Sequence, residues 1–458
     1  MGCFFAFGGK MIVMKFGGTS VEDTAAIDRS CRIVIERLHR QPFVVVSAMA
    51  GVTNDLLEAG RLAGSGKISE SLEFFERLER RHEEFLPKGD LTNLLGLLHW
   101  INEAGEFSPR AQDSVAAWGE DLCSEIFARA LRRLGIEAIH IDARDFIVTD
   151  RNFGNARPLW DKTFKKFQII PEFFKETNRT ALVMGGFIGS AVEDGETTTL
   201  GRGGSDYSAA IVGAAMGAEE IQIWTDVDGM MTADPKIVST ARTIRCLSFA
   251  EASELASFGA KVLHPRTLEP AMDKNIPVYV FNSRNPGGAG TRITRDAVPC
   301  QNIVKSIACK RDVSVITVET SRMLKAVGFL GKLFTILESI GVSVDMVATS
   351  EVSVSFTLDD SSKGPQVLDA LRRPHWAVSL ENNLGLACLV GNDLKWTPGI
   401  AARVFGSIRE FHVRMISHGA SMTNLAFLVR RQQLEEAVHR LHSEFFSEFD
   451  PKVFAEPG

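Results

Sequence analysis

The chain has 458 residues, 45% of them hydrophobic and 24% charged, which is enough for a large catalytic core with one or two smaller modules. The formal net charge is −6 and the basic residues are dispersed, which excludes a nucleic-acid partner bound through a general positive field. No apolar run is long enough to span a membrane, and the seven cysteines are scattered without a Cys-x-x-Cys pair, which excludes a membrane-spanning protein, a disulfide framework and a cysteine zinc site. We therefore expect a cytoplasmic protein.

The N-terminal part of the chain alternates between strand and helix patterns. Residues 1–10 lack the features of a signal peptide and are interpreted as an N-terminal extension. A strand-like run at 11–16 ends in two glycines, a helical pattern follows at 21–39, and a continuous apolar run at 43–48 has the length of a strand. Apolar runs of this kind are typical of parallel strands buried on both faces, and the alternation predicts a three-layer α/β sandwich.

The same order of strand, glycine and helix recurs further along the chain. It is found at 181–189, and again where a helical pattern around 208–216 precedes a strand-like run at 221–224. Residues 54–135 carry apolar side chains at helical spacing, which predicts a mostly helical lobe that shapes the mouth of a site.

The residue pattern of the sequence changes near residue 283. The turn-rich stretch 283–290 predicts a loop or linker, and two weakly similar units follow from about residue 301. Each has a βαββαβ-type, ferredoxin-like pattern. The first unit is predicted to contain strands at 313–319, 342–348 and 351–357 and helices at 330–340 and 364–372. The second is predicted to contain strands at 386–391, 412–417 and 422–429 and helices at 399–410 and 432–445. The expected domains are 1–10, 11–300, 301–382 and 383–458.

The strongest chemical signal is Lys15-Phe16-Gly17-Gly18-Thr19-Ser20, between the first strand and the first helix. Glycines allow backbone N–H groups to approach phosphate oxygens, and a helix N-terminus favours an anion. The ammonium group of Lys15 can neutralise a transferring phosphoryl group. An ordinary strand-to-helix turn is the alternative. The sequence contains neither a Walker A loop nor the protein-kinase motifs, so a different class of phosphate binder is indicated.

A second group, Gly201-Arg202-Gly203-Gly204-Ser205-Asp206, opens a predicted helix. Arg202 can bind a carboxylate through two parallel hydrogen bonds, and Asp206 can orient Lys15 or position the acceptor. The alternatives are a surface salt bridge for Arg202 and a favourable charge at a helix N-terminus for Asp206.

Three further segments supply candidates. Residues 224–236 follow a strand and are rich in hydroxyls and turn formers, which suits a nucleotide base and ribose; their spacing does not fit an EF-hand, so no calcium site is expected. Lys261 can reach the nucleotide, whereas His264 is expected to cap or pack. Glu120 and Thr53 are candidates for substrate contact. Taken without the other segments, Glu120 would be interpreted as an exposed acidic residue on a helix and Thr53 as a helix N-cap.

Together the segments 15–20, 201–206 and 258–265 (Phe-Gly-Ala-Lys-Val-Leu-His-Pro) closely resemble the aspartokinases of the amino-acid-kinase family. The resemblance extends from about residue 11 to the end. It implies the amino-acid-kinase fold and transfer of phosphate from ATP to the β-carboxylate of L-aspartate, which gives 4-phospho-L-aspartate for lysine, threonine and methionine synthesis.

The resemblance also implies a role for each matching residue. Lys15 would stabilise the γ-phosphoryl group and Asp206 would organise Lys15. Arg202 would bind the α-carboxylate of aspartate and Glu120 its ammonium group. Other contacts are implied for two sets: substrate hydrogen bonds from Thr53 and Ser205, and ATP binding by Gly17, Gly18, Thr225, Asp226, Met231, Lys236, Lys261 and Val262. Mg2+ would be bound mainly by ATP oxygens, and no metal site made by protein side chains is expected.

Two positions depart from the pattern of the family. Many relatives have an aromatic residue where Met231 stands and an arginine where Lys236 stands. Met231 can still pack on adenine. Lys236 offers a single point charge in place of the forked guanidinium group of an arginine. These changes put ATP affinity in doubt more than activity.

The C-terminal pair of units resembles ACT domains, and the surrounding pattern is most similar to lysine-inhibited monofunctional aspartokinases. The resemblance implies six candidates for binding lysine: Met323, Ser343, Asp345, Thr349, Ser350 and Glu351. The alternative is that these residues only form the sheet of a small domain. ACT domains pair between subunits, so a homodimer or a dimer of dimers is expected.

Two other functions stay open at this point. One is a kinase of the same family with another acceptor, such as acetylglutamate; the pair Arg202 and Glu120, matched to a free α-amino acid, argues against it. The other is a catalytically silent ACT-type amino-acid sensor, which the presence of Lys15, Arg202 and Asp206 together argues against.

Overall fold

The computed structural model describes residues 11–83, 85, 91–170, 174, 180–259, 263–323, 327–358 and 360–456. These residues form two compact units. The first comprises the described residues within Met1–Met230, Arg245–Phe249 and Val262–Asp296, and the second comprises those within Met231–Ile244, Ala250–Lys261 and Ala297–Gly458. Within the described ranges, no helix combines the length and the apolar character needed to cross a membrane.

The first unit is built on a mainly parallel sheet, as the sequence predicts. In its described part the strand order is β3-β5-β2-β1-β8-β10-β11-β9, and every neighbouring pair is parallel except β10 and β11. The strands are β1 Ile12–Phe16, β2 Pro42–Val46, β3 Glu137–Ile141, β5 Thr180–Gly185, β8 Glu220–Thr225, β9 Cys246–Ser248, β10 Val278–Asn282 and β11 Thr291–Thr294. β1, β2 and β5 are buried along their whole length, which explains their continuous apolar runs.

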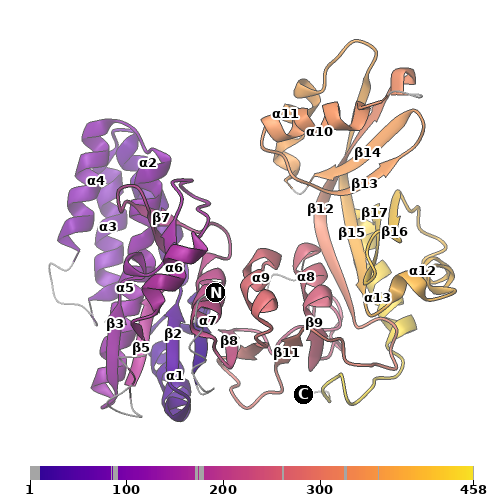
Figure 1. Cartoon of the computed structure of the whole chain (residues 1–458). Helices are drawn as coiled ribbons and strands as arrows, with labels where there is room; N and C mark the ends of the chain where they lie inside the picture. Colours follow the sequence, from indigo (N-terminus) through magenta and orange to yellow (C-terminus); the bar gives the residue numbers. More distant parts are fainter. Residues whose placement is uncertain are drawn as a thin grey trace. The chain divides into compact units, whose positions relative to one another are not determined.

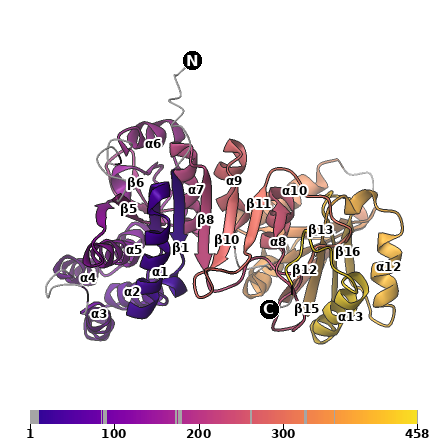
Figure 2. The ribbon, with the colours of Figure 1, turned by 90° about the horizontal axis from the view of Figure 1, so that it is seen from below.

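Helices cover both faces of this sheet, which confirms the predicted three-layer sandwich. Figure 2 shows α1 (Thr24–Glu36) and α5 (Pro109–Arg133) on one face, and α7 (Gly204–Met216) and α9 (Pro265–Lys274) on the other. A small sheet in the order β4-β6-β7 lies in the same unit. The elements of this small sheet are β4 Val148–Thr149, β6 Ile188–Ala191 and β7 Thr197–Thr199, and α6 Trp160–Phe167 packs against β4. The helix α8, Phe249–Ser257, lies mostly in the second unit.

The predicted helical lobe is formed by α2 (Val52–Gly64), α3 (Ile68–His82) and α4 (Thr92–Ala104), which pack together and against α5 (Figure 1). Leu56 and Leu94 are fully buried in its core. The turn-rich stretch 283–290 connects β10 to β11 within the sheet, so it is the loop of an antiparallel pair.

The second unit contains a six-stranded sheet in the order β13-β14-β12-β15-β17-β16. Its elements are β12 Ser306–Glu319, α10 Phe329–Ser339, β13 Val344–Thr349, β14 Ser353–Leu358, α11 Gly364–Ala370, β15 Ala377–Val390, α12 Ile400–Ser407, β16 Met415–His418, β17 Asn424–Arg430 and α13 Leu434–Phe445. Every strand and helix predicted in this region is present, with ends shifted by a few residues, except that the first strand of each predicted unit is much longer than expected.

The order of strands in the second ferredoxin-like module differs from a contiguous βαββαβ pattern. Residues 306–310 of β12 pair with residues 386–390 of β15, so a strand that precedes the first module in sequence completes the second module. Lys310, Arg311 and Asp312 interrupt β12 with a register shift, and Asp312 has a left-handed backbone (φ 63°). Both modules therefore share the long strands β12 and β15. The predicted domain boundaries at residues 300 and 382 stay predictions.

Candidate active site

The loop after β1 has a geometry that only small residues allow. Gly17 donates its backbone N–H to the carbonyl oxygen of Trp224 over 2.9 Å, which joins the loop to the end of β8. A Cβ atom on Gly18 would lie 2.9 Å from the carbonyl oxygen of Ala48, which is too close for any side chain. The backbone of this loop is therefore held at the carboxyl ends of adjacent parallel strands, the edge where α/β folds bind ligands.

Lys15 and Asp206 form an ion pair at this edge. The Nζ atom of Lys15 lies 2.6 Å from Oδ1 of Asp206, and the two side chains are only 10% and 13% exposed. Lys15 belongs to β1 and Asp206 to the first turn of α7, so elements about 190 residues apart in sequence meet here. The structure thus places Asp206 where it can orient the ammonium group.

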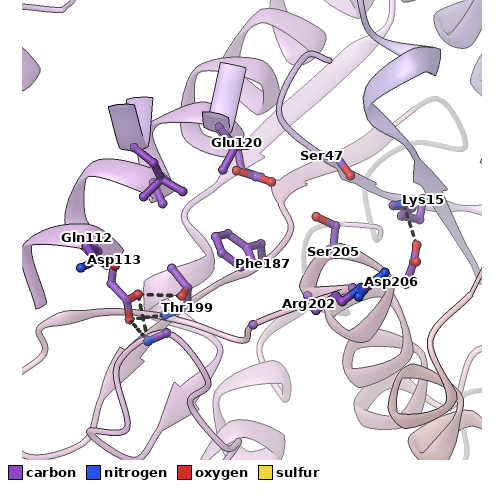
Figure 3. Close-up of a pocket in the computed structure, with 17 residues that line it drawn as sticks. Lys15, Ser47, Gln112, Asp113, Glu120, Phe187, Thr199, Arg202, Ser205 and Asp206 are labelled. Atoms are coloured by element: carbon purple, nitrogen blue, oxygen red, sulfur yellow. Dashed lines mark hydrogen bonds and ion pairs between the residues drawn. The ribbon is translucent and has the colours of Figure 1, made fainter. Parts of the chain in front are cut away.

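The turn that leads into α7 requires glycine at defined positions. Gly201 and Gly203 have φ values of 77° and 73°, in the left-handed region that favours glycine. A Cβ atom on Gly203 would also lie 3.1 Å from atoms of both His264 and Thr267. Arg202, between these glycines, lines the same pocket as Asp206 (Figure 3). Among the described residues it makes no ion pair with a carboxylate, which disfavours the surface salt bridge.

Glu120 is a buried carboxylate in the middle of α5. It is 5% exposed, so it is not an exposed helix acid. Burial raises its pKa to about 8, and a backbone hydrogen bond from Ala48 and the charge of Lys15 only partly oppose this effect. Within the described residues, its Oε2 atom accepts no hydrogen bond. A buried carboxyl group with a raised pKa and an oxygen that accepts no hydrogen bond is suited to bind a positively charged group of a ligand.

These residues line one cavity of about 520 Å³ (Figure 3). Six predicted residues face it: Lys15, Thr53, Glu120, Arg202, Ser205 and Asp206. Thr53 is the second residue of α2, whose N-cap is Gly51, so Thr53 is free of the capping role. The cavity joins an ammonium group, a guanidinium group and a buried carboxylate, a set that can hold a free α-amino acid next to a phosphate-binding loop.

The sequence reasoning missed Asp113, which shapes the same cavity from α5. Its buried carboxylate accepts hydrogen bonds from the backbone of Gly154 (2.9 and 3.0 Å) and from the backbone and hydroxyl of Thr199 (2.8 and 2.7 Å) (Figure 3). Burial raises the pKa of Asp113 despite these bonds. Asp113 therefore ties a loop and β7 to the helix that carries Glu120. A polar residue on a long helix gives no local signal for such contacts.

Phe187 is the second residue that was missed. It lines the cavity with a left-handed backbone (φ 66°), which is costly for a residue with a bulky side chain. Its N–H donates to Oγ of Ser208 over 2.9 Å, and its carbonyl accepts from Leu200 over 2.9 Å. These bonds hold the strained backbone, and the ring forms part of the wall of the cavity.

The residues predicted to bind ATP are distributed differently. Thr225 ends β8 and Asp226 follows it, so both lie at the same carboxyl edge as Gly17 and Gly18, although none of the four lines the 520 Å³ cavity. Met231 and Lys236 belong to the second unit, where the Met231 carbonyl accepts a hydrogen bond from Ser306 over 2.7 Å. Lys261 and Val262 lie outside the described residues. Nucleotide binding by all these residues stays a prediction.

Most candidates for effector binding lie on β13 or next to its ends in the second unit. Asp345 is held by Lys310 of β12, whose Nζ atom lies 2.8 Å from Oδ2 of Asp345. At the turn after β13 the hydroxyls of Ser350 and Ser353 are 2.8 Å apart. Thr349 is the last residue of β13, and Ser343 and Glu351 lie just outside its two ends, whereas Met323 lies in a short helix after β12.

Comparison with known proteins places the chain among characterised families. The Amino acid kinase family matches residues 10–282, and the ACT domain matches residues 316–373 and 388–445. The chain belongs to the amino acid kinase family. It is 38% identical over 457 residues to the lysine-sensitive aspartokinase 3 of Escherichia coli (strain K12), which covers 95% of this chain and 99% of that relative.

Solved structures agree with this assignment. The fold is similar to that of E. coli aspartokinase III in complex with aspartate and ADP, with a TM-score of 0.82 and 37% identity over 95% of this chain and 100% of that chain. The complex of the same enzyme with lysine and aspartate gives a TM-score of 0.79 and 36% identity, over 96% of this chain and 100% of that chain.

Proposed function

We propose that this chain is an aspartokinase that transfers the γ-phosphoryl group of MgATP to the β-carboxylate of L-aspartate. The observation that carries the proposal is the cavity in which Lys15, Arg202 and Glu120 meet. The similarity to aspartokinases over nearly the whole chain supports the same activity.

The acceptor is bound through both charges of its α-amino acid group. The guanidinium group of Arg202 binds the α-carboxylate, and the carboxylate of Glu120 binds the ammonium group. The hydroxyls of Thr53 and Ser205 add hydrogen bonds. An N-acylated acceptor has no ammonium group, so it would leave the buried Glu120 without a cation. We therefore expect the cavity to favour aspartate over a substrate such as acetylglutamate.

The reaction requires no protein nucleophile. An oxygen of the aspartate β-carboxylate attacks the γ-phosphorus, the new O–P bond forms, and the bond from the γ-phosphorus to the bridging oxygen breaks to release ADP. Lys15 neutralises the charge on the migrating group, and Asp206 holds Lys15 in position. Catalysis therefore consists of alignment and charge neutralisation.

The nucleotide binds at the carboxyl edge of the first sheet. Gly17 and Gly18 offer backbone N–H groups to the phosphates, and Thr225, Asp226, Met231, Lys236, Lys261 and Val262 complete the site. The loop around Lys15 offers hydrogen-bond donors, which suit phosphate oxygens. It does not offer a cluster of carboxylates, which would suit a cation bound by the protein itself. Mg2+ accompanies the nucleotide and is bound mainly by its oxygens, the ligands that this cation prefers.

Lysine binds to the first ACT module and inhibits the enzyme. The ammonium group of Lys310 now neutralises Asp345. An effector lysine would substitute its own ammonium group for that of Lys310, while Met323, Ser343, Thr349, Ser350 and Glu351 complete its site. The subunits pair through their ACT modules as a dimer or a dimer of dimers, and the protein acts in the cytoplasm.

A coupled assay of ADP release tests the proposal. We expect ADP release that depends on L-aspartate, no turnover with N-acetylaspartate, and inhibition by lysine when lysine, threonine and methionine are added singly and in pairs. Lys15→Ala is the matched control for contaminating kinases. ADP release that Lys15→Ala leaves intact, or equal turnover with the N-acetylated acceptor, would refute the assigned site.

A further inference from the structure

The first unit has a second cavity, of about 450 Å³, which the proposed reaction does not use. It is lined by Arg157, Pro158, Trp160, Tyr207, Arg266 and Glu269. These residues come from the loop before α6 and from the helices α6, α7 and α9, and α7 packs against both of the other helices (Figure 1). A volume of this size is within the range of small-molecule sites.

Positive charge dominates this second cavity. Arg157 is exposed, and neither it nor Arg266 forms an ion pair with a carboxylate of the described residues. Nη1 of Arg266 instead donates to the neutral amide oxygen of Asn155 over 2.6 Å. Among the described residues that line the cavity, Glu269 is the only acidic one, so two guanidinium groups stand against one carboxylate.

The helices α6 and α9 both have their N-termini at this second cavity. Trp160 is the first residue of α6 and Arg266 is the second residue of α9, and neither helix has a side-chain cap at its N-terminus. The helix dipoles add to the attraction for an anion.

Aromatic rings form the rest of the wall. The rings of Trp160 and Tyr207 meet edge to face, with centroids 6.4 Å apart, and the guanidinium carbon of Arg266 lies 5.3 Å from the Tyr207 ring centroid. Tyr207 is 5% exposed, whereas Trp160 is 38% exposed and can be covered by a ligand. The cavity thus offers aromatic side chains and two guanidinium groups, and guanidinium groups bind phosphate in a fork geometry.

From this combination we propose that the cavity between α6, α7 and α9 binds an organic phosphate monoester. Its phosphate binds to Arg157 and Arg266, and its apolar or aromatic part covers Trp160. The proposal is independent of the kinase activity, because its readout is binding rather than turnover.

Titration calorimetry with phenyl phosphate as the probe tests the site on the full chain. We expect binding by the wild type and a loss of about 10-fold or more in affinity for Arg157→Ala and for Arg266→Gln, because each removes a charge-assisted contact. Arg151→Ala is the matched control. Arg151 belongs to the same loop, lies outside the cavity and pairs with Asp194 at 3.1 Å, so its replacement should leave the affinity unchanged.

Two further comparisons locate the probe. Binding should change tryptophan fluorescence in the wild type and not in Trp160→Phe, and Lys15→Ala should bind as tightly as the wild type. Benzoate, which has one negative charge, should bind about 10-fold more weakly. The proposal is overturned if the wild type does not bind, if Arg157→Ala binds normally, if Lys15→Ala abolishes binding, or if benzoate binds equally well.

Discussion

Replacing Glu120 by glutamine should stabilise the unliganded protein while weakening aspartate binding. Glu120 is 5% exposed, and burial raises its pKa from the ordinary value of 4.5 to about 8. A shift of this size corresponds to a cost on the order of 5 kcal/mol for holding the ionised carboxylate in the empty cavity. Glutamine has the same shape and carries no charge, so it removes this cost.

The sign of the pH dependence follows from proton binding. Between pH 4.5 and about 8 the folded state keeps the proton on Glu120 that the unfolded state has lost, so folding stability falls as the pH rises through this window. Urea unfolding of the ligand-free protein should show Glu120→Gln equal to the wild type near pH 4 and more stable by several kcal/mol near pH 9. The low-pH comparison is the internal control.

Binding should change in the opposite direction. The ammonium group of aspartate loses a charged partner in Glu120→Gln, which should raise the KM for aspartate by about 10- to 100-fold, because a charge-assisted hydrogen bond contributes about 1.5–3 kcal/mol. The KM for ATP should stay near the wild-type value. An unchanged KM for aspartate, or a variant that is less stable than the wild type near pH 9, would show that Glu120 is a structural residue and would refute this reasoning.

Three other variants test the active site and the proposed effector site. Lys15→Ala should lower kcat by about 1000-fold or more while calorimetry still detects aspartate binding, because the lost charge acts on the phosphoryl group; near wild-type turnover would contradict its role. Gly203→Ala should cost about 1–3 kcal/mol in urea unfolding and lower kcat/KM, because a φ of 73° is strained for alanine and its Cβ atom would lie only 3.1 Å from neighbouring side chains; an unchanged midpoint of urea unfolding would count against this. Asp345→Ala should relieve inhibition by lysine in the ADP-release assay with little effect on uninhibited turnover, and full lysine sensitivity would exclude Asp345 from the effector site.

Local sequence patterns identified the parts of the site that depend on local backbone geometry. The glycines around Lys15 and Arg202 are required by close backbone contacts and left-handed turns, and such requirements are visible in one sequence. The buried strands of the first sheet were predictable for a similar reason, since they are apolar on both faces. Most of the predicted elements lie within a few residues of the observed ones.

Long-range contacts were not predictable in this way. Asp113 looks like any polar residue of a helix, yet its carboxylate binds residues 41 and 86 positions away. The completion of the second ferredoxin-like module by residues 306–310 depends on pairing with β15, about 80 residues later, which has no local signature. The buried state of Glu120 likewise follows from packing against distant elements rather than from its own helix.

A crystal structure with aspartate and a non-hydrolysable ATP analogue tests the central claim most directly. We expect the Nζ atom of Lys15 within hydrogen-bond distance of the γ-phosphate, and the guanidinium group of Arg202 in contact with both oxygens of the α-carboxylate. Side chains of Lys15 and Arg202 that point away from both bound ligands would contradict the account.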